Sequence, residues 1–178
     1  MPTGFLDPSE ILNQLFLEKD TIAADFGCGF GGWAIPLARK IEDGIVYAVD
    51  VQESALSATM SKANLQGISN IKKILADIER GVKQLETNSC DFILMTNLLF
   101  QVNDKLAVFK EAKRILKENG KILVIEWDME SSFGPMQESR VSSGRTQEIA
   151  EKTGFVLEKK IETSGYHYGL LFIKCSQN

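Results

Sequence analysis

The stretch Ala24-Asp25-Phe26-Gly27-Cys28-Gly29-Phe30-Gly31-Gly32 decides the fold class of this chain. The apolar run over residues 21–26 predicts a strand that leads directly into the glycines. A helix must begin close to Gly32, because Pro36 is tolerated only in the first turn of a helix. A strand, a tight glycine turn and a helix in that order form the first unit of an α/β sheet.

Outward from this turn, the chain alternates predicted strands with predicted helices. The first helix begins at Asp7-Pro8, where the aspartate caps the helix and the proline takes its first position. Strands are expected at residues 45–51, 71–76, 92–96, 121–127, 155–163 and 168–174, and further helices at residues 53–66, 104–119 and 146–153. The join Ser164-Gly165-Tyr166-His167 is too short for a crossover helix, so the last two strands are antiparallel.

These elements predict a single α/β domain over residues 1–178. Its sheet is doubly wound and Rossmann-like, mostly parallel, with a C-terminal antiparallel hairpin. Along the chain we expect an N-terminal helix and lid segment (1–19), a cofactor-binding core (20–128), and an acceptor-side loop with a short helix and the closing hairpin (129–178).

The composition argues against several kinds of partner, namely nucleic acids, metal ions and membranes. The chain has 178 residues, 44% hydrophobic and 25% charged, which is typical of a soluble globular domain. Its net charge of −4 argues against a nucleic-acid partner, because such proteins usually present a basic surface. The three cysteines lack a CxxC spacing, so we expect no metal site and a reducing, cytoplasmic setting. No apolar run approaches the roughly 20 residues of a membrane helix.

The glycine turn predicts a site for an anion. The free N–H groups at the helix start favour either a dinucleotide pyrophosphate or the carboxylate of an amino-acid cofactor. The spacing Gly27-x-Gly29-x-x-Gly32 formally satisfies the dinucleotide pattern. Asp25 favours the second alternative, because a carboxylate beside a pyrophosphate is repulsive, whereas an ammonium group would attract it. S-adenosylmethionine carries both an ammonium group and a carboxylate on its methionine end.

The glycine turn also resembles the first motif of class I S-adenosylmethionine-dependent methyltransferases. Residues 46–50 are similar to the second strand of that family with its ribose-binding acid, and residues 75–78 to the third-strand motif whose acid meets the adenine amino group. Residues 112–123 are similar to the stretch before the fifth strand, except that Asn119 stands where proline is frequent. The resemblance covers residues 5–175 and is closest to the branch that includes ubiquinone- and menaquinone-biosynthesis methyltransferases.

The resemblance implies a seven-stranded sheet with the last strand inserted beside the fifth. It also implies S-adenosylmethionine as cofactor and S-adenosylhomocysteine as product. The residues expected to bind the cofactor are Asp25, Gly27, Cys28, Gly29, Gly31, Asp50, Val51, Asp77, Ile78 and Asn97. Other interpretations stay open: Asp77 caps the segment after it, Val51 and Ile78 only pack, and Asn97 begins a turn. Cys28 is then a small residue in a tight turn.

The methyl acceptor is expected beyond the carboxyl ends of the parallel strands. The segments that reach this edge are residues 5–7, 97–101, 128–145 and 164–168. His167 and Tyr166 are the candidate catalytic residues, because imidazole is the side chain best poised as a base near neutral pH. In the alternative, strand alternation sends His167 to solvent and a tyrosine to the core. Arg140 and Arg145 either bind an acidic substrate or are solvated loop charges.

We therefore expect an enzyme that transfers a methyl group by in-line displacement to a small or medium-sized acceptor. A protein or peptide methyltransferase with the same cofactor site, and a non-catalytic cofactor-binding module, remain as alternatives. The stretch Asn97-Leu98-Leu99-Phe100 lacks the prolines typical of enzymes that methylate amino groups of nucleic acids and of some glutamine methyltransferases, which argues against those substrates. An oxidoreductase is disfavoured because no second domain supplies a substrate site.

Overall fold

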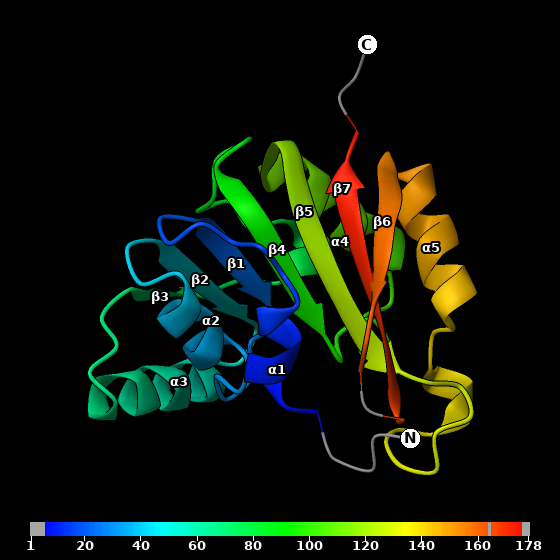
Figure 1. The fold of residues 1–178 in the computed structure, drawn as a ribbon, viewed down its shortest axis with the longest axis horizontal. Helices are drawn as coiled ribbons and strands as arrows, with labels where there is room; N and C mark the ends of the chain where they lie inside the picture. Colours follow the sequence, from blue (N-terminus) through cyan, green and yellow to red (C-terminus); the bar gives the residue numbers. More distant parts are fainter. Residues whose placement is uncertain (1–5, 164, 176–178) are drawn as a thin grey trace.

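A computed structural model describes residues 6–163 and 165–175 (Figure 1). Phe5, expected on the acceptor side, and Ser164, expected in the hairpin join, lie outside the described residues. The helices are α1 (Pro8–Asn13), α2 (Ala34–Lys40), α3 (Glu53–Leu65), α4 (Lys105–Ile115) and α5 (Ser143–Lys152), with short 3-10 turns η1 (Ile78–Arg80) and η2 (Gln137–Ser139). The strands are β1 (Ile22–Phe26), β2 (Ile45–Asp50), β3 (Ile71–Leu75), β4 (Cys90–Thr96), β5 (Leu116–Trp127), β6 (Phe155–Ile161) and β7 (His167–Lys174).

All seven strands belong to one sheet in the order β3-β2-β1-β4-β5-β7-β6. The first five strands in this order run parallel, whereas β7 is antiparallel to both β5 and β6. The expected doubly wound sheet with an inserted last strand is therefore confirmed. The carboxyl ends of the parallel strands and the start of β7 meet at the lower edge in Figure 1.

Helices cover both faces of the sheet (Figure 1). The helices α1, α2 and α3 pack on one face through a cluster that includes Leu12, Leu37 and Leu56. The helices α4 and α5 pack on the other face through a cluster that includes Phe109 and Ile149. Within the described residues, no helix combines the length and apolar character that a membrane span requires.

Local capping signals in the sequence act as expected at two helices. Asp7 accepts a hydrogen bond from the Ser9 N–H at 2.8 Å, which caps α1 at its start. Gly67 follows the end of α3 with a φ of +69°, and the Ile68 N–H returns to the Ala63 carbonyl at 2.9 Å. A left-handed glycine at this position ends a helix.

The helix expected at residues 104–119 ends earlier, so that part of the prediction is wrong. The helix α4 stops at Ile115, and Leu116 already pairs with Cys90 as the first residue of β5. Leu116 is fully buried, and Asn119 takes a φ of +62°, which a helix does not allow. Burial of Leu116 and the left-handed turn at Asn119 therefore override the helical periodicity of the sequence.

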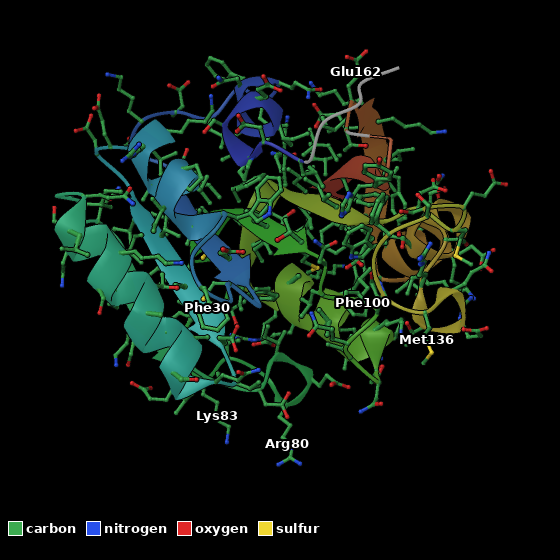
Figure 2. The ribbon with its side chains drawn as sticks, turned by 90° about the horizontal axis from the view of Figure 1, so that it is seen from below. Phe30, Arg80, Lys83, Phe100, Met136 and Glu162 are labelled. Atoms are coloured by element: carbon green, nitrogen blue, oxygen red, sulfur yellow. The ribbon has the colours of Figure 1, made fainter. Side chains whose placement is uncertain are left out.

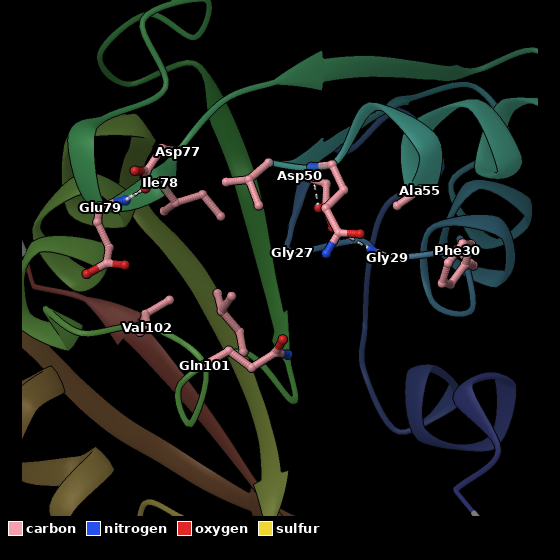
Figure 3. Close-up of a pocket in the computed structure, with 13 residues that line it drawn as sticks. Gly27, Gly29, Phe30, Asp50, Ala55, Asp77, Ile78, Glu79, Gln101 and Val102 are labelled. Atoms are coloured by element: carbon pink, nitrogen blue, oxygen red, sulfur yellow. Dashed lines mark hydrogen bonds between the residues drawn. The ribbon is translucent and has the colours of Figure 1, made fainter. Parts of the chain in front are cut away.

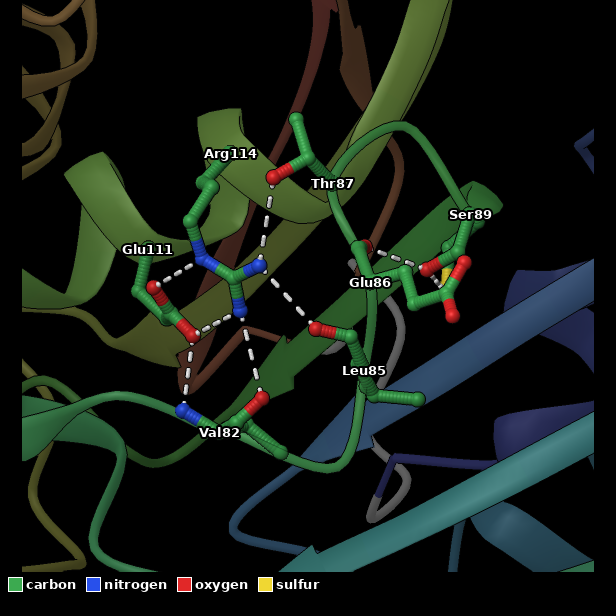
Figure 4. A network of polar contacts seen from close by, with 8 residues as sticks. Val82, Leu85, Glu86, Thr87, Ser89, Glu111 and Arg114 are labelled. Carbon is green, nitrogen blue, oxygen red and sulfur yellow. Dashed lines mark hydrogen bonds and ion pairs between the residues drawn. The ribbon is translucent and has the colours of Figure 1, made fainter.

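Arg114, in the stretch before the fifth strand, has a structural role (Figure 4). Its guanidinium pairs with Glu111 at 2.6 Å and donates to the carbonyls of Val82 and Leu85. Glu111 in turn accepts the Val82 N–H at 2.6 Å. Figure 4 shows that this network fastens the connection before β4 to α4.

Candidate functional site

A cavity of about 350 Å³ lies beyond the carboxyl ends of β1, β2 and β3, beside the segment that follows β4 (Figure 3). This volume is in the range of small-ligand sites. In Figure 3, Asp77 and Glu79 face Asp50 and Gly29 across the cavity, with Gln101 on a third side. The lining residues are Gly27, Gly29, Phe30, Asp50, Val51, Gln52, Ala55, Asp77, Ile78, Glu79, Leu98, Gln101 and Val102.

The glycine turn after β1 has a backbone that other residues would not adopt without strain. Gly27, Gly29 and Gly31 have φ values of +72°, +52° and +79°. A Cβ atom at Gly27 would lie 2.8 Å from Cδ1 of Leu98, and one at Gly31 would lie 2.8 Å from Cγ2 of Thr59. No atom would lie within 4 Å of a Cβ at Gly29, so the turn opens toward the cavity at this residue.

Asp50 ends β2 and ties the glycine turn to the wall of the cavity (Figure 3). Its Oδ2 accepts the Gly29 N–H and its Oδ1 accepts the Gln52 N–H, both at 2.9 Å. The side chain lines the cavity although it is only 8% exposed. Because a carboxylate oxygen accepts more than one hydrogen bond, Asp50 keeps acceptor capacity for the hydroxyls of a ribose.

Asp25, near the end of β1, is the most unusual group of the site. Its side chain is fully buried, and neither carboxylate oxygen has a hydrogen-bond partner among the described residues. Burial, and next the negative charge of Asp50, raise the pKa of Asp25 to about 7. The Ala34 N–H opposes this rise without forming a well-aligned hydrogen bond.

An unpaired buried carboxylate is costly unless a ligand completes it. The ammonium group of S-adenosylmethionine would supply the missing positive charge and the missing donors. Together with the open glycine turn and the size of the cavity, Asp25 fits this cofactor. A pyrophosphate would instead add a second negative charge next to Asp25 and Asp50.

Asp77 both caps the next segment and lines the cavity. Its Oδ1 accepts the Glu79 N–H at 3.0 Å, and its Oδ2 lies 3.3 Å from Nε of Arg80. Ile78 and Val51 line the cavity as well. Val51 is 61% exposed, so packing alone does not account for this apolar side chain. The contacts of these three residues with an adenine stay predictions.

Four of the predicted cofactor-binding residues, Asp25, Cys28, Gly31 and Asn97, do not line this cavity, and Asp25 is buried two residues before the lining residue Gly27. Burial raises the pKa of the Cys28 thiol well above its usual range, and the side chain is 6% exposed, which fits a small residue in a tight turn. Gly31 packs against Thr59. Asn97 has a φ of +52° and begins the turn after β4, as the alternative interpretation expected, while its side-chain oxygen is buried with no partner among the described residues.

Sequence reasoning missed two larger parts of the site, besides the lining residues Phe30, Gln52, Ala55 and Glu79. The first is the segment after β4, of which Leu98, Gln101 and Val102 line the cavity. Its place after a parallel strand is a signal, but the sequence predicts only Asn97 of this segment as a cofactor residue and residues 97–101 as reaching the acceptor side. The second is Glu126 on β5, whose Oε1 accepts the N–H groups of Leu98 and Leu99 at 2.6 and 2.5 Å. An isolated acid in an apolar strand was the signal for this residue.

The strand register places Trp127 and His167 on the same sheet face as Asp25. Asp25 pairs with Leu94, and the register continues through β4 and β5 to the pair Trp127–His167. Side chains two or four residues apart on a strand share a face. The rings of Trp127 and His167 stack with centroids 4.0 Å apart. One pair of aromatic rings therefore stands at the carboxyl edge, on the face covered by α1 and α2.

His167 has no hydrogen-bond partner for either ring nitrogen among the described residues, and both nitrogens are buried. Burial lowers the pKa of His167 to about 4, so the imidazole is neutral at pH 7. The prediction that alternation sends this side chain to solvent does not hold, because the residue is only partly exposed and stacks on Trp127. A neutral imidazole with free nitrogens can accept or donate a hydrogen bond.

The two tyrosines beside His167 differ in their surroundings. Tyr168 points to the opposite face, where its hydroxyl donates to the Val141 carbonyl at 2.8 Å and lies 2.7 Å from Oγ1 of Thr146. Burial raises the pKa of this phenol further. Tyr166 contacts Phe133 edge-on, with centroids 5.0 Å apart. Tyr168 is therefore structural, and the catalytic role of Tyr166 stays a prediction.

Arg140 organises the loop after β5 rather than binding solvent or substrate. Its guanidinium donates to five backbone carbonyls of this loop, those of Asp128, Met129, Ser131, Phe133 and Pro135. Gly134 of the same loop lies against the Trp127 indole, where a Cβ would be 2.5 Å from Cδ2. Figure 2 looks onto the carboxyl edge, with Met136 of this loop on one side and Phe30 of the glycine turn on the other.

Arg145 differs from Arg140, because it is exposed and pairs with Glu148 at 2.8 Å within α5. It fits the interpretation of a solvated charge.

Comparisons with known proteins agree with this geometry. A family model described as a methyltransferase domain matches residues 17–164. A demethylmenaquinone methyltransferase from Geobacillus kaustophilus is 29% identical over 126 residues, which are 70% of this chain and 53% of that protein. The chain thus spans about half the length of the curated relatives that it matches.

Solved structures share the fold over nearly the whole chain. A SAM-dependent methyltransferase from Aquifex aeolicus has a TM-score of 0.88 and 27% identity, and the match covers 95% of this chain and 90% of that one. A protein from Sulfolobus solfataricus described as a type 11 methyltransferase has a TM-score of 0.80 and 28% identity, with 98% and 96% covered.

Proposed function

Because this chain belongs to the methyltransferase-domain family, we propose that it transfers the methyl group of S-adenosylmethionine to a small-molecule acceptor. The observation that carries the proposal is the buried, unpaired carboxylate of Asp25 beside the open glycine turn. The relatives named above as demethylmenaquinone methyltransferases make a quinol ring the first acceptor to test.

The donor site is formed by residues that follow β1, β2 and β3. Asp25 holds the ammonium group, and the methionine end lies over the glycine turn, which is open at Gly29. Asp50 accepts hydrogen bonds from the ribose, and Asp77 meets the adenine amino group. When bound, the cofactor would supply an electrophilic methyl group: a lone pair of the acceptor would form a bond to the methyl carbon as the C–S bond breaks, and S-adenosylhomocysteine would leave as the neutral thioether.

The acceptor lies between Asp25 and His167 on their shared face. These residues are on β1 and β7, with β4 and β5 between them. At about 4.8 Å per strand, they are separated by at least ~14 Å across the sheet. The methionine end of the cofactor and one small acceptor together would span such a distance. The loop fixed by Arg140 closes this side and disfavours a protein acceptor.

His167 positions the acceptor or takes its proton. The ring is held on Trp127, is neutral at pH 7, and has buried nitrogens that are free to bond. A hydroxyl on the acceptor ring would satisfy one nitrogen, and general-base transfer requires this hydrogen-bond contact directly or through one water. Tyr166, the neighbouring residue, packs edge-on against Phe133 and is the second candidate. The lone, unpaired cysteines are compatible with a reaction in the reducing cytoplasm.

The test is a turnover assay with S-adenosylmethionine and a panel of reduced naphthoquinols and benzoquinols, with mass detection of the methylated product. His167→Ala should lower the turnover rate by about 10²–10⁴-fold, the usual contribution of a general base. Its affinity for S-adenosylhomocysteine should stay within about threefold of the wild type. Tyr168→Phe, on the other face, is the matched control for folding.

Methylation of peptides but not of quinols in the same assay would favour the protein-directed alternative. Binding of the cofactor without turnover of any acceptor in a cell extract would favour a non-catalytic module.

A further inference from the structure

Glu126 is a buried acid that the proposed chemistry does not use. It lies near the carboxyl end of β5, is 1% exposed, and faces the side of the sheet covered by α4 and α5. An ionised carboxylate in this position is costly unless strong donors surround it. An acid at this position therefore needs hydrogen-bond donors close to its carboxyl group.

The partner is the backbone of the turn after β4. Oε1 of Glu126 accepts both the Leu98 N–H and the Leu99 N–H, at 2.6 and 2.5 Å. The two donors converge because Asn97, with its φ of +52°, turns the chain just before them. Successive N–H groups in such a turn form a small concavity that binds an anion. Burial raises the pKa of Glu126 to about 7, and Oε1 accepts the two N–H groups whether or not the other oxygen carries a proton. Glu126 is therefore an internal acceptor that fixes this turn.

The same turn forms one wall of the cofactor cavity. The Leu98 side chain contacts Gly27 so closely that a Cβ there would lie 2.8 Å from Cδ1. Gln101 and Val102, three and four residues further on, line the cavity as well. Further hydrogen bonds keep the turn compact, from the Gln101 side chain to the Asn97 carbonyl at 2.6 Å and from Lys105 to the Val102 carbonyl at 2.9 Å.

We propose that Glu126 is a positioning residue that holds the turn at residues 97–102 in the shape required for cofactor binding. Its carboxylate fixes the N–H groups of Leu98 and Leu99. Leu98 then covers Gly27, and Gln101 faces the cavity. Glu126 itself touches neither donor nor acceptor. The consequence for the cofactor rests on the proposed function, whereas the effect on the turn does not.

Three substitutions test this role. In Glu126→Gln, the amide oxygen accepts the same two N–H groups without charge. In Glu126→Leu no acceptor remains, and in Glu126→Asp the carboxylate is withdrawn by one methylene. The matched control is Glu130→Gln, an exposed acid just beyond the same strand. Glu126→Asp keeps the test valid should Glu126→Leu fail to fold.

The first readout is hydrogen exchange without ligand. In Glu126→Leu and Glu126→Asp the amides of Leu98 and Leu99 should exchange at least tenfold faster, while those of Ile93 and Leu94 in the centre of β4 stay unchanged. Glu126→Gln should restore exchange to within about threefold of the wild type. A role in general stability alone would instead accelerate exchange along the whole of β4.

The second readout is calorimetric affinity for S-adenosylhomocysteine. We expect a loss of 10- to 100-fold in Glu126→Leu and Glu126→Asp, with rescue by Glu126→Gln. Unchanged exchange at Leu98 and Leu99 in both disruptive variants, or no rescue by glutamine, would overturn the positioning role. If the wild type does not bind S-adenosylhomocysteine, the proposed function fails, and exchange alone still decides whether Glu126 holds the turn.

Discussion

At the carboxyl edge of the sheet, the side that holds Asp50 and Asp77 (the donor side) and the side that holds Trp127 and His167 (the acceptor side) are built in different ways. On the donor side, Asp50 and Asp77 each accept the amide of the residue two positions later, and Asp50 also accepts the Gly29 N–H, 21 residues before it. On the acceptor side, Arg140 binds within its own loop, but the stacking of Trp127 on His167 depends on the pairing of β5 with β7. Short motifs therefore encode much of the donor side, whereas the ring pair of the acceptor side depends on long-range strand pairing.

The largest effect should come from breaking the glycine turn of the donor side. Gly31→Val places a branched side chain at a φ of +79°, with a Cβ 2.8 Å from Thr59. Backbone strain and overpacking each cost about 1–3 kcal/mol, so the free energy of unfolding should fall by about 2–6 kcal/mol. Urea denaturation measures this change, and cofactor binding should be lost.

The control for this variant is Gly32→Ala. Gly32 has no positive φ, and no atom would lie within 4 Å of its Cβ. The same loss of stability in both variants would show that close packing at Gly31 is not the cause.

The next largest effect concerns Asp25, whose buried carboxylate should lower the stability of the free protein although it is needed to bind the ligand. Its pKa is raised to about 7 in the folded state from an ordinary value of 3.8, so stability falls as the pH rises between these values. The charged form costs about 4 kcal/mol above pH 7, and an unpaired buried amide costs about 1–3 kcal/mol. Asp25→Asn should therefore stabilise the free protein by about 1–3 kcal/mol at pH 8.

Denaturation at pH 8 and at pH 4 checks this sign. The advantage of Asp25→Asn should shrink and reverse toward pH 4, where the wild-type carboxyl is mostly protonated. A variant that is less stable than the wild type at pH 8 would mean that Asp25 is already paired in the free protein.

A smaller effect is expected on the acceptor side from Arg140→Ala. The five carbonyls that the guanidinium binds lie in a surface loop, where water replaces the lost donors. We expect a loss of about 1–2 kcal/mol in stability, in the range of one charge-assisted hydrogen bond. Exchange of amides in residues 128–140 should accelerate, while affinity for S-adenosylhomocysteine should stay within about threefold. A tenfold loss of that affinity would contradict the separation of the two sides.

The smallest effect should follow Cys28→Ala. The thiol is buried, and its pKa is raised by that burial, so it is not a nucleophile at neutral pH. Turnover should be unchanged and stability should fall by no more than about 1 kcal/mol. Alkylation of the wild type at pH 8 should label Cys175 before Cys28, and rapid labelling of Cys28 would contradict its burial.

The same contrast explains what the sequence could predict. The alternation of strands and helices follows from hydrophobic periodicity, whose physical cause is local, whereas the strand order and the roles of Asp50 and Asp77 were expected from the family resemblance of short motifs. The end of α4 was misplaced because Leu116 is drawn into the sheet by pairing with Cys90. The roles of Glu126 and Arg140 were missed because each side chain binds backbone that only the folded chain brings near.

His167 could be predicted from the sequence only in part. As the only histidine of the sequence it was recognisable as a candidate, but its stacking on Trp127 depends on the register of β5 with β7. A one-residue shift of that register would have turned it to the opposite face.

The most direct test of the account is the affinity for S-adenosylhomocysteine of the wild type and of Asp25→Asn, measured by calorimetry at pH 8 and at pH 5.5. The ligand should lower the pKa of Asp25, so that wild-type binding weakens about tenfold or more toward pH 5.5 and releases protons in between. Asp25→Asn should bind about 10- to 100-fold more weakly at pH 8 and show a much flatter dependence on pH. Equal affinity of the two proteins at pH 8, or tighter binding of NAD than of S-adenosylhomocysteine by the wild type, would contradict a methyl-donor site at Asp25.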